Sequence, residues 1–206
     1  KAAPVLPSQT IMTVKASLDS DERLKKSFEI ITKDINEVAS PPNQMAIVCL
    51  TSDTFPILVA PNDDEENETE NEEPKENQGE LIDTTIRLPT IAASYSTSGR
   101  LVCFSQFTFL TNAILQIGQT MKLVTRTINW LCDGKVEDSP IGIFTKSPEL
   151  NESLVSCLKR LNMNPIENTD LQTDLSESKL IIVSSDVDTS DTSLYAKLVE
   201  FSMGGG

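Results

Sequence analysis

Short apolar runs alternate with amphipathic helical patterns in the last third of the chain, and this alternation constrains the fold more than any other feature. Residues 141–144 and 180–183 are apolar runs of strand length. Residues 150–161 and 190–203 carry apolar side chains at helical spacing. Strand, helix and strand in succession favour parallel strands joined by right-handed crossovers. We therefore predict an α/β fold with three layers, in which a largely parallel sheet is flanked by helices.

The first two thirds of the chain predict further elements of the same kinds. We expect a helix over residues 19–38, capped by Asp19 or Ser20, because apolar residues recur there at helical spacing. The other expected elements are strands over 45–50 and 55–60, a hairpin of strands 90–94 and 100–105, partly helical residues 107–118, a helix over 121–132 and a short strand over 165–167. The pair Asp133-Gly134 should end the helix before it. Continuous apolar runs such as 45–50 are typical of strands buried on both faces of a sheet.

One segment stands apart by its charge. Residues 63–80 hold ten acidic residues and one lysine, which accounts for −9 of the formal net charge of −14. We predict that this segment is a solvated loop inserted in one domain, residues 19–206, which follows an N-terminal extension, residues 1–18. The residue order of an EF-hand calcium loop is missing from it. The glycine run 204–206 directly follows a helical pattern, so we expect the fold to be truncated at its C-terminus.

The composition excludes several classes of function. The chain has no histidine, so it cannot form a Ser-His-Asp or Cys-His nucleophile pair. Zinc-binding, dinucleotide, phosphate-loop and nucleophile-elbow motifs are missing as well. We therefore predict no catalytic, cofactor-binding or metal-binding residue. The acidic balance argues against nucleic acid as a partner, and no apolar run is long enough for direct insertion into a membrane.

The cysteines and a few polar residues remain as candidates. The cysteines at 49, 103, 132 and 157 lie far apart within apolar stretches, which predicts small buried thiols in a reducing, cytoplasmic compartment. Polar residues also follow two predicted strands, where open α/β sheets bind ligands. These candidates are Ser105, Gln106, Ser184, Ser185 and Asp186. The favoured interpretation is that they cap strands and begin turns, with a ligand site as the alternative.

Several runs together resemble a known family. They read FPILV from Phe55, IAASYSTSGRLVCF from Ile91, INWLC from Ile128, PIGI from Pro140 and LVEF from Leu198, and the glycines 204–206 follow. In order and spacing they are similar to the N-terminal region of the TRP-melastatin-channel-associated factors. The resemblance covers the chain from about Phe28 to its end, with the acidic segment as an insertion.

This resemblance implies a class I glutamine-amidotransferase-like domain within a longer protein that carries a peptidase M60-like region. Vertebrate members of the family act as binding partners in the trafficking and gating of a cation channel. The family often has a His-acidic pair after the strand at 100–105, where this chain has Gln106 and Phe107. Active amidotransferases also need a Cys nucleophile at a strand–helix elbow and a His partner. None of the cysteines here is at such an elbow, so the resemblance implies a scaffold without enzyme activity.

The leading hypothesis is therefore a non-catalytic protein-interaction or scaffold domain of a larger protein. Its expected partner is a protein, either a membrane channel or a large assembly, which would hold a cytoplasmic chain at a membrane or at the cytoskeleton. One alternative is an accessory substrate-binding domain of an M60-like metallopeptidase. The other is a structural component of a cytoskeletal or ciliary assembly, which rests on analogy of fold alone.

Overall fold

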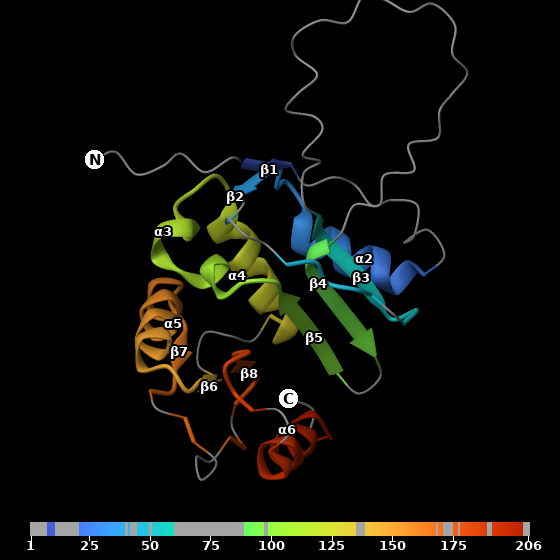
Figure 1. Cartoon of the computed structure of the whole chain (residues 1–206). Helices are drawn as coiled ribbons and strands as arrows, with labels where there is room; N and C mark the ends of the chain where they lie inside the picture. The colour runs from blue at the N-terminus through green and yellow to red at the C-terminus, as the bar shows by residue number, and fades with distance from the viewer. Residues whose placement is uncertain are drawn as a thin grey trace, which may run out of the picture.

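The computed structural model describes the chain in several stretches. They are residues 8–10, 21–39, 41, 45–49, 51–59, 89–96, 99–134, 139–167, 169–170, 175–176, 178–188 and 191–203. The predicted acidic loop 63–80 and most of the predicted extension 1–18 lie outside these residues. The described residues form a mixed α/β fold with three small sheets (Figure 1).

The first helix, α2 (Glu22–Thr32), is shorter than the prediction of 19–38. Asp21 caps it, because its side chain accepts a hydrogen bond of 2.9 Å from the backbone N–H of Arg23. After Thr32 the chain turns at Asp34, whose φ of 53° is left-handed and ends helical geometry. Residues at the end of the predicted helix instead form strand β2 (Glu37–Ala39), which pairs antiparallel with β1 (Ser8–Thr10). The predicted caps Asp19 and Ser20 lie outside the described residues.

Residues at the N-terminal end of helix α4 (Thr120–Leu131) form hydrogen bonds with the segment that follows α2. The side-chain oxygen of Gln119 accepts a hydrogen bond of 2.7 Å from the N–H of Asn36, and its amide donates one of 3.1 Å to the carbonyl of Asp34. The hydroxyl of Thr120 accepts a hydrogen bond of 2.7 Å from the N–H of Ala39. These bonds satisfy backbone groups that the turn after α2 leaves unpaired, so α4 fixes the path of the chain there.

An antiparallel sheet in the order β3-β4-β5 packs beside α2. It consists of β3 (Thr54–Val59), β4 (Pro89–Ser96) and β5 (Gly99–Phe104). The strand predicted at 55–60 and the predicted hairpin are confirmed, apart from Ala60, which lies outside the described residues. The strand predicted at 45–50 is wrong for residues 45–49, which are not in a strand. The N–H of Ile47 donates one bond to the carbonyl of Pro89, and no ladder forms along this run, so Met45 and Val48 stay exposed.

The second half of the chain follows the predicted alternation closely. Its elements are the 3₁₀ helix η2 (Phe107–Leu110), α3 (Asn112–Leu115), α4, β6 (Pro140–Phe144), α5 (Pro148–Arg160), β7 (Asn164–Pro165), β8 (Leu180–Val183) and α6 (Thr192–Met203). The strands form a parallel sheet in the order β7-β6-β8. Asp133 and Gly134, with φ of 58° and 77°, end α4 as expected. Element ends differ from the predicted ones by up to three residues.

Side chains cover this parallel sheet on both faces. Ile141 and Ile143 of β6 pack in one cluster with Leu154 of α5, while Phe144 packs in another with Leu194 of α6. Alternate residues of a strand point to opposite faces, so α5 and α6 lie on opposite sides of the sheet. Among the described residues, the two pairings β6-β7 and β6-β8 are parallel and the other three strand pairings are antiparallel. The largely parallel character that we predicted is therefore confined to the second half.

Helix α4 joins the two halves through opposite sides of its surface. Leu123 and Trp130 belong to the first apolar core, which also contains α2 and the antiparallel sheet. Val124 and Ile128 belong to the second core, which contains β6 and α5. One helix thus fills both cores, so a change in its position would disturb both sheets.

The cysteines divide into two pairs, which corrects the prediction of four buried thiols. Cys132 and Cys157 are buried, and burial raises the pKa of each thiol to about 11. Cys49 is half-buried and Cys103 is exposed. The side chain of Cys103 lies on the outward face of β5, together with Leu101, which is 66% exposed. An antiparallel sheet can leave one face in water, and an apolar run alone does not reveal this.

Candidate functional site

The polar residues predicted at strand ends follow strands of two different sheets. Ser105 and Gln106 come after β5, while Ser184, Ser185 and Asp186 come after β8. Among the described residues no hydrogen bond joins the two groups. The structure therefore does not assemble these five candidates into one site.

Asp186 orders the loop between β6 and α5. Its Oδ2 accepts hydrogen bonds from the Thr145 hydroxyl at 2.9 Å and from the backbone N–H groups of Lys146 and Ser147 at 3.0 and 2.9 Å. Desolvation by itself raises the pKa of this carboxyl, but the bonds from Thr145, from Ser184 and from the two N–H groups outweigh it and hold the pKa below its ordinary value. Ser147 in turn caps α5 by accepting a bond of 3.2 Å from the N–H of Leu150.

The other pair of candidates also has local partners. Gln106 precedes η2, and its side-chain oxygen accepts a hydrogen bond of 3.0 Å from the hydroxyl of Thr108. The N–H of Ser105 donates to the carbonyl of Thr90 at 2.9 Å. The Ser105 hydroxyl is buried and has no hydrogen-bond partner within the described part of the chain.

A cavity of about 490 Å³ lies elsewhere, between α2, the β4–β5 hairpin and the end of α4. Ile30 of α2 lies at this cavity and is 48% exposed. The hairpin contributes Tyr95 and Arg100 to the lining. Trp130 and Asp133 line it from the end of α4. Three elements distant in the sequence therefore form one concave surface.

Arg100 of the hairpin contacts several other residues of this cavity lining. The carbon of its guanidinium lies 5.0 Å from the ring centroid of Tyr95 and 5.3 Å from that of Trp130. Its Nη2 lies 3.0 Å from Oδ1 of Asp133, and its Nη1 donates a hydrogen bond to the carbonyl of Trp130. A guanidinium that lies over aromatic rings gains cation–π stabilisation, and its planar donor fork can bond a carbonyl at a helix end.

The surroundings keep Arg100 charged and hold its aromatic neighbours in place. Burial alone lowers the pKa of Arg100, but hydrogen bonds to Tyr95 and Asp133 raise it above its ordinary value. Trp130 makes edge-to-face contacts with Phe55 and Tyr95, each at a centroid distance of 6.0 Å. We name the set Tyr95, Arg100, Trp130 and Asp133 the arginine clamp. It fastens the antiparallel sheet to α4.

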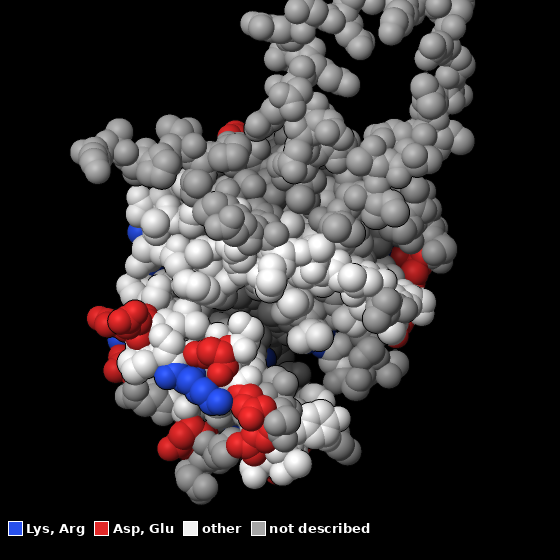
Figure 2. All heavy atoms as spheres, in the orientation of Figure 1, with Lys and Arg blue, Asp and Glu red and all other residues white. Residues whose placement is uncertain are grey.

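The charge of the cavity is opposite in sign to that of the whole chain. The lining residues that are charged at neutral pH are Arg23, Lys26, Arg100 and Asp133, whereas the whole chain has a net charge of −14. Arg23 pairs with Asp21 at 2.9 Å on the surface. Lys26 has no ion pair with any described residue. In Figure 2, acidic side chains gather over the lower left of the visible face, where Figure 1 draws α5 and the β7–β8 region.

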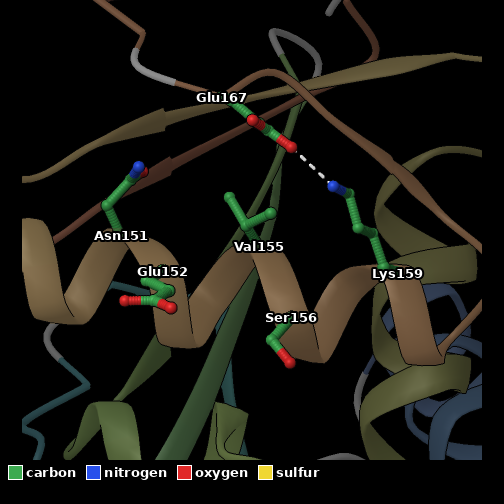
Figure 3. A pocket seen from close by; sticks show the side chains of 6 residues that line it. All are labelled: Asn151, Glu152, Val155, Ser156, Lys159 and Glu167. Atoms are coloured by element: carbon green, nitrogen blue, oxygen red, sulfur yellow. Dashed lines mark hydrogen bonds and ion pairs between the residues drawn. The ribbon is translucent and has the colours of Figure 1, made fainter.

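A second depression, of about 400 Å³, lies beside α5. Figure 3 shows its lining, in which α5 contributes Asn151, Glu152, Val155 and Ser156, and Lys159 reaches toward Glu167. The Lys159 Nζ lies 2.5 Å from the Glu167 carboxylate, and both side chains are more than half exposed. Exposed ion pairs contribute little free energy, because water and salt screen them. We therefore favour the cavity with the arginine clamp as the candidate site.

Two further searches bear on the candidate chemistry. In the stretches that the structure describes, no group of three or more Cys, Asp or Glu side chains is placed to hold a metal ion. No helix among the same residues has the length and apolar character needed to cross a membrane.

Sequence reasoning did not find the arginine clamp. Tyr95, Arg100 and Trp130 all lie in the runs that carry the family resemblance. Their place in those runs was the sequence feature that could have pointed to them. Their joint position depends on how the hairpin packs on α4, which no local pattern contains. Comparison of the chain with family models, curated proteins and solved structures finds no match.

Proposed function

We propose that this chain is a non-catalytic protein-interaction domain, and that a segment of a partner protein binds in the cavity beside the arginine clamp. The observation that carries the proposal is the contact of Arg100 with the rings of both Tyr95 and Trp130 at the wall of this cavity. Tyr, Trp and Arg are the residue types that dominate binding energy at protein interfaces. The exposed Ile30 of α2 adds an apolar side chain to the cavity lining.

The described side chains support binding rather than catalysis. The clamp keeps Arg100 protonated and engaged with Asp133, so it neither takes up nor releases a proton near neutral pH. A rigid aromatic and arginine surface loses little conformational entropy when a partner binds, which favours recognition. The family resemblance makes a membrane channel or a large assembly the first partner class to test.

We also propose that the fold is the three-layer arrangement of a class I glutamine-amidotransferase-like domain without its enzyme activity. The parallel sheet β7-β6-β8, with α5 and α6 on opposite faces, supports this assignment. The absence of histidine from the sequence supports the loss of activity.

Site-specific photo-crosslinking tests the binding proposal. A photoreactive phenylalanine analogue at Ile30 should form a discrete protein adduct in cell extract, and the same analogue at the exposed Leu101 should not. Charge reversal of Lys26 to Glu should weaken the Ile30 adduct, because it removes a cation from the cavity lining. The matched variant Lys159→Glu, beside α5, should leave the adduct unchanged. Identical adducts at Ile30 and Leu101 would refute the cavity as the binding site.

A further inference from the structure

Within the described residues the parallel sheet ends at β8, and no described strand covers its outer edge. In the order β7-β6-β8, β6 pairs with β8 on one side, and no described strand pairs with β8 on the other. Its residues are Leu-Ile-Ile-Val, without charge, proline or a bulge. Proteins protect exposed edge strands with charged side chains, proline, bulges or a covering element. The β8 sequence carries none of the first three.

The backbone of β8 has hydrogen-bonding groups that point away from β6. The N–H of Ser184 donates to the carbonyl of Phe144 in β6 at 3.0 Å, so Ser184 faces β6. Backbone groups of successive residues in a strand point alternately to its two sides. Ile182 therefore also faces β6, and Ile181 and Val183 direct their N–H and C=O groups outward. No described residue bonds to these outward groups.

The side chains beside this edge are apolar on both faces of the sheet. Leu180 and Ile182 pack only partly against the cluster of α4 and α5, and Ile181 packs partly against the cluster of α6. Val183 is 37% exposed. Strands of parallel sheets are normally buried on both faces, so this edge has the composition of an interior strand.

We propose that the free edge of β8 binds an extended, uncharged peptide segment of another protein by adding it as a strand. Outward N–H and C=O groups at Ile181 and Val183, two residues apart, match the spacing of an extended backbone. The absence of charge on β8 favours an uncharged partner strand. This edge is separate from the cavity with the arginine clamp, so the inference goes beyond the proposed function and does not depend on it.

The length of β8 argues for a peptide segment rather than a second copy of the chain. Four residues span about 13 Å at about 3.3 Å per residue. A stable interface between two folded proteins buries at least roughly 1,200 Å², which so short an edge does not provide. A single extended segment requires no such area, and we expect it to bind with an affinity in the high micromolar range.

Binding of a model peptide to the full chain tests the proposal. The probe is a fluorescein-labelled peptide of seven residues that alternates valine and threonine. Its fluorescence anisotropy should rise saturably with protein concentration. Backbone hydrogen exchange should slow at Ile181 and Val183, whose N–H groups would gain partners. Exchange at Ile182 should change little, because its N–H already faces β6.

Two matched substitutions separate edge binding from unspecific apolar contact. Val183→Lys should weaken peptide binding at least tenfold, because it places a charge at the edge. Val199→Lys changes a side chain of nearly equal exposure on α6 and should retain binding within about twofold. Lys26→Glu, at the cavity with the arginine clamp, should also retain peptide binding. Failure of one proposal therefore leaves the other testable.

Three outcomes would overturn the inference. They are no saturable binding up to about 1 mM protein, equal binding by Val183→Lys and the unsubstituted chain, and unchanged exchange at Ile181 and Val183. A dimer in sedimentation that is lost on Val183→Lys would assign the edge to a second copy instead.

Discussion

Replacement of Arg100 by alanine tests whether the arginine clamp fastens the antiparallel sheet to α4. Two cation–π contacts, at 5.0 and 5.3 Å, contribute about 0.5 to 1 kcal/mol each. The charged hydrogen bond to the carbonyl of Trp130 adds about 1 kcal/mol, reduced from its buried value because the Arg100 side chain keeps 19% exposure. Asp133 is 81% exposed, so its ion pair adds less than about 0.5 kcal/mol. We therefore expect Arg100→Ala to lower the free energy of unfolding by about 2 to 3 kcal/mol.

Urea denaturation followed by tryptophan fluorescence measures this loss, because Trp130 is the single tryptophan of the chain and lies in the clamp. The matched control is Arg23→Ala, whose side chain is 56% exposed and pairs only at the surface. This control should leave the free energy of unfolding almost unchanged, because water and salt screen an exposed ion pair. A loss for Arg100→Ala no larger than that control would refute the clamp. So would an Asp133→Ala variant as unstable as Arg100→Ala, because the reasoning assigns most of the stabilisation to the aromatic rings.

Three other predictions concern the fold and the thiols. Gly118→Ala should lower the free energy of unfolding by at least about 2 kcal/mol in urea denaturation, since φ is +53° and a Cβ would lie 2.9 Å from the Glu37 carbonyl oxygen. Gly134→Ala, also left-handed but in open space, should cost only about 1 kcal/mol, and equal losses would contradict the steric argument. Asp186→Asn should destabilise the chain at pH 7 by less than about 1 kcal/mol, because the carboxyl is exposed. Its folded pKa is lowered, so its contribution is present above the unfolded pKa of about 3.9 and is lost as pH falls through the folded value. The difference in thermal midpoint between Asp186→Asn and the unsubstituted chain should therefore shrink below about pH 4, and a constant difference would contradict the role of the charge. Iodoacetamide at pH 8, followed by mass spectrometry, should alkylate Cys103 first and should leave Cys132 and Cys157 unmodified until unfolding, because burial raises their pKa to about 11. Alkylation of all four thiols at one rate would contradict the burial.

Local patterns in the sequence determined most of the helices and strands. Local periodicity was enough to predict β6, β8 and α5, because the pattern of apolar residues in each depends only on neighbours along the chain. The hairpin of β4 and β5 was predicted for the same reason, since its two strands are adjacent. The acidic stretch at 63–80 also stood out by composition alone.

The predictions of secondary structure and burial failed where a segment depends on contacts with residues that are distant in the sequence. The apolar run at 45–49 has the composition of a buried strand, but no edge pairs with it. The predicted first helix extended past Asp34, because the bonds from Gln119 that hold the following turn come from α4. Cys103 was expected to be buried, yet it lies on the solvent face of β5. Whether an apolar run is covered on one face or two is a property of the sheet around it.

The candidate site could be found only from the tertiary structure, for the same reason. Each of its residues has an ordinary local role, in a strand or at a helix end, and the local sequence determines that role. Arg100 contacts both Tyr95 and Trp130 because α4 packs against the antiparallel sheet through Trp130, while other residues of α4 pack against β6. Arg100 and Trp130 are 30 residues apart in the sequence, and they meet because α4 packs against the antiparallel sheet. Only the folded chain establishes that contact.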